Sequence, residues 1–139
     1  MARPSTSIYK NIKEETYTVQ PRTMGPVGTN DFGDPTIIST EEFETRIAGA
    51  IFENLEKFGK EKFELERAIR RNSREDHDFR KRHLFVSVYR DDAGGLTIYP
   101  EHRVRGGSEG RHEDTITLSE SDLPQKLPEA IAEAFRRAR

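Results

Sequence analysis

Residues 39–55 read STEEFETRIAGAIFENL, and this stretch determines more of the fold than any other part of the chain. Ser39 followed three positions later by Glu42 is a capping box, a pattern typical of a helix N-terminus. Apolar residues then recur at positions 43, 47, 50, 51 and 55, so they line one face of an α-helix. We therefore predict the main helix over residues 39–58, with Gly59 ending it.

The C-terminal part of the chain shows the same pattern again. Ser119 and Asp122 stand 80 positions after Ser39 and Glu42, and LPEAIAEAF at 127–135 repeats the apolar spacing. Because proline is favoured in the first turn of a helix, the sequence predicts a C-terminal helix over residues 127–138. Two explanations remain open, namely an internal repeat and two unrelated amphipathic helices that share a common cap.

The remaining segments favour strands and loops. Residues 7–12 and 16–20 have strand-like composition, and residues 84–118 predict a β-meander with strands at 84–89, 96–104 and 115–118. The turn of its first hairpin is Asp-Asp-Ala-Gly-Gly at 91–95, and residues 105–110 predict a flexible connection.

Two further segments complete the prediction of the fold. Residues 21–35 read PRTMGPVGTNDFGDP, which predicts a loop, and residues 60–72 predict a second helix followed by a charged stretch without defined structure. Together these elements predict a single α+β domain over residues 1–139, with an antiparallel sheet packed against two or three helices.

Composition narrows the class of protein. Charged residues make up 35% of the chain and the hydrophobic class only 32%, which indicates a small core under a charged surface. There is no cysteine, so disulfides and thiolate chemistry are excluded and a cytoplasmic location is expected. The net charge of −2 gives no general attraction to nucleic acid or to anionic lipid. No apolar run is long enough to span a membrane, and the first residues show no signal peptide.

The histidines, serines and acidic residues do not form a recognisable catalytic motif. The histidines at 77, 83, 102 and 112 lack the spacing of metal ligands, and no serine lies in a nucleophile elbow. We expect no catalytic set, no bound metal and no cofactor. One alternative is a small histidine-dependent hydrolase or nuclease built on His102, His112 and nearby acids.

Two charged segments are candidate binding surfaces. The basic cluster, a possible nucleic-acid site, contains Arg70, Arg71, Arg74, Arg80, Lys81 and Arg82, but three acidic residues interrupt it. The acidic run contains Asp31, Asp34, Glu41, Glu42 and Glu44, with no basic residue between Arg22 and Arg46. Glu42 serves the helix cap, so we predict Asp31, Asp34, Glu41 and Glu44 as residues that bind a partner.

Taken together, these segments resemble one family of immunity proteins from bacterial contact-dependent growth inhibition systems. That family repeats the pattern Leu-Gly-x-Ala-Ile-x-x-Ala-Leu after a Ser-x-acid-acid opening, and residues 47–55 and 127–135 match it twice. This chain departs from the pattern at Ala48, Pro128 and Asn54. The resemblance implies a cytoplasmic protein without enzymatic activity that binds and neutralises the toxic C-terminal domain, often a nuclease, of its cognate exoprotein.

Overall fold

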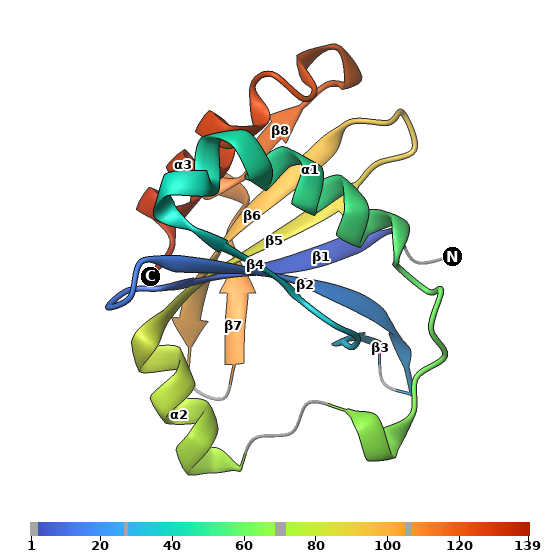
Figure 1. Cartoon of the computed structure of the whole chain (residues 1–139), viewed down its shortest axis with the longest axis vertical. Coiled ribbons are helices and arrows are strands. Elements are labelled where there is room, and N and C mark those ends of the chain that lie inside the picture. Colours follow the sequence, from blue (N-terminus) through green and yellow to red (C-terminus); the bar gives the residue numbers. More distant parts are fainter. Residues whose placement is uncertain (1–2, 27, 69–71, 105–106) are drawn as a thin grey trace.

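Strands from both halves of the chain form one curved antiparallel sheet (Figure 1). The computed structural model describes residues 3–26, 28–68, 72–104 and 107–139. Its strands are β1 (Ser5–Asn11), β2 (Thr16–Gly25), β3 (Gly28–Asp31), β4 (Thr36–Ser39), β5 (His83–Arg90), β6 (Leu96–Val104), β7 (Gly107–Gly110) and β8 (Ile116–Leu118). Its helices are α1 (Phe43–Glu56), α2 (Ser73–Arg82) and α3 (Leu127–Arg137), with short 3-10 turns η1 (Thr40–Glu42), η2 (Leu65–Arg67), η3 (His112–Asp114) and η4 (Glu120–Asp122).

The strands follow the order β3-β2-β1-β5-β6-β7, while β4 also pairs with β2 and β8 also pairs with β6. Helices α1 and α3 contact each other on one face of the sheet, and α2 lies on the opposite side (Figure 1). The prediction of a single α+β domain with an antiparallel sheet packed against helices is confirmed. Among the described residues, no helix is long and apolar enough to cross a membrane.

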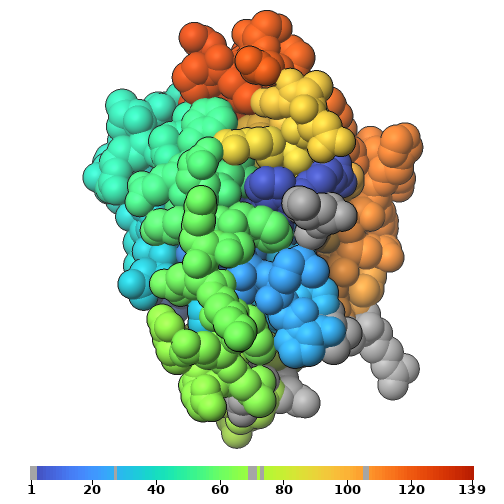
Figure 2. Space-filling view, turned by 90° about the vertical axis from the view of Figure 1, so that its right-hand side faces the viewer, coloured from blue at the N-terminus to red at the C-terminus, as the bar shows by residue number. Residues whose placement is uncertain are grey.

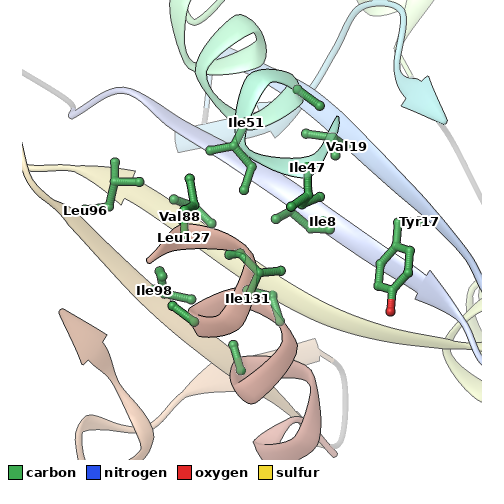
Figure 3. Packing of buried hydrophobic residues seen from close by; sticks show 14 of the residues in the cluster. Ile8, Tyr17, Val19, Ile47, Ile51, Val88, Leu96, Ile98, Leu127 and Ile131 are labelled. Atoms are coloured by element: carbon green, nitrogen blue, oxygen red, sulfur yellow. The ribbon is translucent and has the colours of Figure 1, made fainter. Parts of the chain in front are cut away.

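The core lies between the sheet and the two helices α1 and α3 (Figure 3). Ile47 and Ile51 of α1 are fully buried, as the 39–55 pattern predicts. Strand residues meet them in facing pairs, such as Ile8 with Val19 on neighbouring strands. Each fully buried aliphatic side chain contributes about 1.5–3 kcal/mol relative to an exposed one, so this layer supplies most of the apolar stabilisation.

Both predicted capping boxes are present. The Glu42 carboxylate accepts from the Ser39 backbone N–H at 3.3 Å, and Asp122 accepts from the Ser119 N–H at 2.9 Å. In each case the first turn after the cap is a 3-10 turn, so α1 begins at Phe43 instead of residue 39. Pro128 lies in the first turn of α3, as predicted, because that position needs no backbone donor.

The prediction of a loop over residues 21–35 is wrong, because β2 runs through Pro21 to Gly25 and turns back into β3. The physical reason is a change of neighbours along β2. Its outer edge pairs with β4 up to Val19 and with β3 from Arg22 onward, so Pro21 lies between the two ladders. A missing backbone donor is tolerated at such a break. Residues 107–110, predicted as part of a flexible connection, form β7 on β6; residues 105–106 lie outside the described residues.

The second predicted helix is also misplaced. Residues 60–68 contain only the 3-10 turn η2, and residues 69–71 lie outside the described residues. The helix occupies 73–82 instead, where Asn72 caps it by accepting from the Glu75 N–H at 2.9 Å. Acids in its first turn and bases in its last turn complement the helix dipole, which explains why this polar segment is helical.

The two halves of the chain have the same order of elements and the same pairing. Four strands, a capped 3-10 turn and a helix occur once in residues 5–56 and again in residues 83–137. Arg22 pairs with Asp31 across β2 and β3, and Glu101 pairs with Gly110 across β6 and β7. Both shifts are 79 residues, because 101 − 22 and 110 − 31 are equal. The structure therefore favours an internal repeat over two unrelated helices with the same cap.

The two repeats are joined edge to edge through β1 and β5. Ser7 of the first repeat pairs directly with Ser87 of the second, 80 positions later, so a pseudo-twofold axis passes between these two residues. Equivalent residues of the two repeats therefore flank the axis on either side. Arg22 and Glu101 are one such pair, and they lie on the face of the sheet away from α1 and α3.

Candidate functional site

The face of the sheet away from α1 and α3 carries a connected set of polar side chains. Side chains alternate between the two faces of a strand, so the residues next to the buried Ile8, Val86 and Val88 point to this face. Six polar side chains on this face form the sheet-face network: Ser7, Tyr9, Arg22, Asp31, Ser87 and Glu101. The network contains one basic and two acidic side chains, and this combination is unusual on a buried strand face.

Arg22 lies at the centre of the network, and its side chain is only 8% exposed. Its Nε donates to Ser7 Oγ at 2.6 Å and its Nη2 donates to Ser87 Oγ at 2.8 Å. One guanidinium therefore joins both serines of the pseudo-twofold axis. The guanidinium carbon also lies 5.6 Å from the centre of the Tyr89 ring, a distance at which a cation is attracted to an aromatic face.

Asp31 supplies the negative charge that offsets Arg22. Its Oδ1 lies 3.6 Å from Arg22 Nε and accepts from the Ser7 hydroxyl at 2.6 Å, while its Oδ2 accepts from the Tyr9 hydroxyl at 2.5 Å. Burial and the neighbouring Asp31 carboxylate both raise the pKa of Tyr9, so its hydroxyl stays protonated and remains a donor. This arrangement fixes β3 against β1 and β2.

Glu101 is the second acid of the network and has a different environment. Its Oε1 accepts from the Ser87 hydroxyl at 3.0 Å. Among the described residues, no basic side chain lies within 4.0 Å of its carboxylate. Burial raises the pKa of Glu101, although the Ser87 hydrogen bond and the charge of Arg22 partly oppose this effect.

Residues of the network line several hollows, among them a large one, a small one and a third that Glu101 lines together with Arg3, Tyr89, Tyr99 and Gly110. The large hollow, of about 380 Å³, is lined by Ser7, Arg22, Asp31, Phe63, Ala68, Phe85, Ser87, Tyr89 and Glu101, among others. The small hollow, of about 130 Å³, is lined by Tyr9, Phe79, Arg80, His83, Phe85, Glu101 and Arg103, among others. Glu101 and Phe85 line both, so the Glu101 carboxylate lies where the two hollows meet.

The segment after α1 forms one wall of the large hollow. In Figure 2 this segment, coloured green, runs down the side of the molecule beside the blue atoms of β2 and β3. Thr23 donates its hydroxyl to the Glu61 carbonyl at 2.7 Å, and the rings of Phe32 and Phe63 lie 5.6 Å apart. These contacts hold the segment in place without closing the hollow.

The structure does not bring the four predicted partner-binding acids together. Asp31 belongs to the sheet-face network, whereas Asp34, Glu41 and Glu44 are exposed. Asp34 precedes β4 and lines a separate hollow together with Lys57 and Lys60, whereas Glu41 and Glu44 follow β4. The acidic run therefore contains no basic residue in sequence, but lysines lie beside it in the folded chain. Its role in binding stays a prediction.

The histidines do not form an open catalytic site. His102 is buried, because it lies on the core face of β6. Its Nε2 lies 2.6 Å from Asp114 Oδ2, so this nitrogen has its partner within the protein. His112 is exposed on η3. Across the ranges that the structure covers, no three potential ligands are grouped so that they could hold a metal ion.

The basic cluster is partly used to hold the fold together. Arg80 Nε lies 2.9 Å from Asp76 Oδ2, and its Nη1 donates to the Gly107 carbonyl at 2.7 Å. Arg103 in turn donates to the Arg80 carbonyl at 2.7 Å. These bonds attach α2 to β6 and β7, so Arg80 is not free to bind nucleic acid, whereas Arg74, Lys81 and Arg82 are exposed.

Sequence reasoning missed the sheet-face network because its members come from distant positions. Arg22 and Ser87 are 65 residues apart, and only the pairing of β1 with β5 brings them together. One signal was available. Ser7-Ile8-Tyr9 recurs as Ser87-Val88-Tyr89 at the same 80-residue offset as the caps, which places a serine on the same face of both strands.

Comparison with known proteins adds information on the fold alone. No protein-family model matches the chain, and no curated protein is similar to it in sequence. A solved structure that is similar is that of the Neisseria meningitidis protein of unknown function NMB0488, with a TM-score of 0.71 and 13% sequence identity. The match covers 99% of this chain and 96% of that one. The two proteins therefore share their whole architecture, and the comparison assigns no activity.

Proposed function

We propose that this protein is an immunity protein, which binds and neutralises the toxic C-terminal domain, often a nuclease, of a contact-dependent growth inhibition exoprotein in the cytoplasm. Binding would take place on the sheet face around the large hollow. The observation that carries the proposal is this hollow, which is open, preformed and lined by arginine and aromatic side chains. Arginine and aromatic residues are enriched at the centres of protein–protein interfaces.

The state of the polar groups favours binding over catalysis. The Arg22 guanidinium and the Asp31 carboxylate satisfy each other and the nearby hydroxyls, so they hold a fixed shape. The histidine–acid pair that could support hydrolysis is His102 with Asp114, and His102 is only 6% exposed. A substrate would therefore not reach it, whereas a partner can reach the sheet face.

A blocking substitution tests the proposal. Ala68 lines the large hollow, and Ala68→Trp would fill it without removing any side chain of the network. Ala93→Trp is the matched control, because Ala93 is exposed in the turn between β5 and β6 and does not line the hollow.

The assay is co-expression with the C-terminal domain of the exoprotein encoded immediately upstream, scored by cell survival and by co-purification. We expect wild type and Ala93→Trp to protect and Ala68→Trp to lose protection. If wild type neither protects nor co-purifies, the proposed function is wrong. If Ala68→Trp protects as well as wild type, binding does not use this face.

A further inference from the structure

Glu101 differs from Asp31 and Asp76 in that no basic group of the described residues pairs with its carboxylate. Asp31 has Arg22 at 3.6 Å and Asp76 has Arg80 at 2.9 Å. Glu101 is half-buried, with the Ser87 hydroxyl as its hydrogen-bond donor and no basic group within 4.0 Å in the described ranges. A half-buried carboxylate without a cation weakens the folded state, so its presence needs a reason outside the free chain.

The internal repeat shows which position could carry a counter-ion for Glu101 and that no side chain occupies it. Across β2 and β3, Arg22 faces Asp31 and the two charges offset each other. At the equivalent place across β6 and β7, Glu101 faces Gly110, which has no side chain. A Cβ at position 110 would lie 3.1 Å from Tyr99 Cδ1, so the Tyr99 ring occupies the space beside this glycine. The first repeat thus contains a complete ion pair, whereas the second has an acid at the position of Arg22 and no side chain at the position of Asp31.

The surroundings of Glu101 suit a cationic side chain that enters from outside. Phe85 and Tyr89 line the large hollow beside the carboxylate, and aromatic walls accommodate both the aliphatic stem and the charged head of lysine or arginine. Two of the basic groups nearby already have partners, while a third, Arg3, lies over the Tyr89 ring with its guanidinium carbon 5.3 Å from the ring centre. Arg22 is held by Asp31 and the two serines, and Arg80 is held by Asp76 and the Gly107 carbonyl.

We propose that the large hollow is a subsite for a lysine or arginine side chain of the protein partner, which pairs with the Glu101 carboxylate. That the site accepts a cationic side chain follows from the contacts described above. That this side chain belongs to a toxin domain rests on the proposed function.

The test uses the whole chain and two side-chain mimics, n-butylguanidinium and n-butylammonium chloride, followed by NMR chemical shifts of backbone amides. We expect saturable shifts in the millimolar range at Phe85, Ser87 and Glu101, and at least a fivefold weaker response in Glu101→Gln. The matched control Glu53→Gln changes an exposed glutamate of α1 and should respond as wild type does. Shifts that are absent, or unchanged in Glu101→Gln, overturn the subsite.

A second measurement uses the toxin domain that the co-expression assay identifies. Glu101→Gln should weaken its binding at least tenfold, mostly through faster dissociation, because the pair is shielded from water. Equal affinity for wild type and Glu101→Gln overturns the proposal even if the mimics bind. The two proposals can fail separately, because the mimic titration contains no toxin and the Ala68→Trp assay does not depend on Glu101.

Discussion

Replacing Arg22 with methionine tests whether the sheet-face network contributes to stability as its geometry implies. Methionine is a flexible side chain that fills irregular gaps but cannot donate a hydrogen bond. Arg22→Met therefore removes the bonds to Ser7 and Ser87 and leaves the Asp31 carboxylate without its cation. Breaking one partner out of a buried ion pair typically destabilises a protein by about 3–5 kcal/mol.

The lower end of that range applies here. The Asp31 side chain keeps 20% exposure and still accepts from the Ser7 and Tyr9 hydroxyls, so its charge is not left fully unsatisfied. We therefore expect a loss of about 3 kcal/mol in the free energy of unfolding, which for a domain of this size lowers Tm by about 10 °C. Urea denaturation and thermal melts followed by circular dichroism measure both quantities.

The control is Arg46→Met, which removes a pair of the same type on the surface. Arg46 Nη1 lies 2.9 Å from Glu42 Oε2, and both side chains are nearly half exposed, so the loss should stay below about 1 kcal/mol. The double variant with Arg22→Met and Asp31→Asn should lose less free energy of unfolding than the sum of the two single variants, by at least about 1 kcal/mol. A loss of stability in Arg22→Met no larger than that in Arg46→Met would refute the stabilising role of the network. Additive losses in the variant that combines Arg22→Met with Asp31→Asn would refute it as well.

Three further predictions follow from the core, the hollow and the acidic residues. Ile51→Ala removes a fully buried side chain beneath the sheet and should lose about 3 kcal/mol by urea denaturation; a loss below about 1 kcal/mol contradicts the core described above. Burial raises the pKa of Glu101, so the folded chain binds this proton more strongly than the unfolded chain does. The resulting destabilisation is absent below the ordinary value of 4.5, grows as the pH rises through the folded pKa and is complete above it. Glu101→Gln should therefore melt at a higher temperature than wild type at neutral pH, with the gap closing in acid, and equal melting at neutral pH contradicts this. Reversing Asp34, Glu41 and Glu44 to lysine should slow association with the toxin domain at low salt and leave the melting temperature nearly unchanged, since all three are exposed. Unchanged association rates at low and high salt would leave these residues without a role in steering.

The elements that the sequence predicts well are those with local determinants. Over residues 39–55, the cap and the helical spacing lie within one segment, and α1 follows from them. The 91–95 hairpin is similarly local, because Asp91 accepts from the Gly95 N–H at 2.8 Å and Gly94 adopts a positive φ of 88°. Where a few neighbouring residues satisfy their own backbone groups, pattern and structure agree.

The elements that the sequence predicts poorly depend on distant partners. The composition of residues 21–25 is that of a loop, and they become a strand because Pro21 lies opposite Thr6 of β1 and residues 22–25 pair with β3. The placement of residues 60–68 depends on Phe32 and Thr23, which lie more than thirty positions earlier. The sheet-face network needs the β1–β5 pairing, a contact between the two halves that periodicity within one segment does not reveal.

The way the two repeats differ supports a binding role for the sheet face. On the core side they remain alike: Ile47, Ala50 and Ile51 of α1 match Leu127, Ala130 and Ile131 of α3, all buried. On the opposite face the equivalent pairs Arg22–Asp31 and Glu101–Gly110 carry different charges. Packing alone would favour the same solution on both sides of the pseudo-twofold axis, because the scaffold beneath is the same. The divergence instead leaves one ion pair complete and one carboxylate open to a hollow, and this asymmetry is expected where a face is selected for a partner and not for stability.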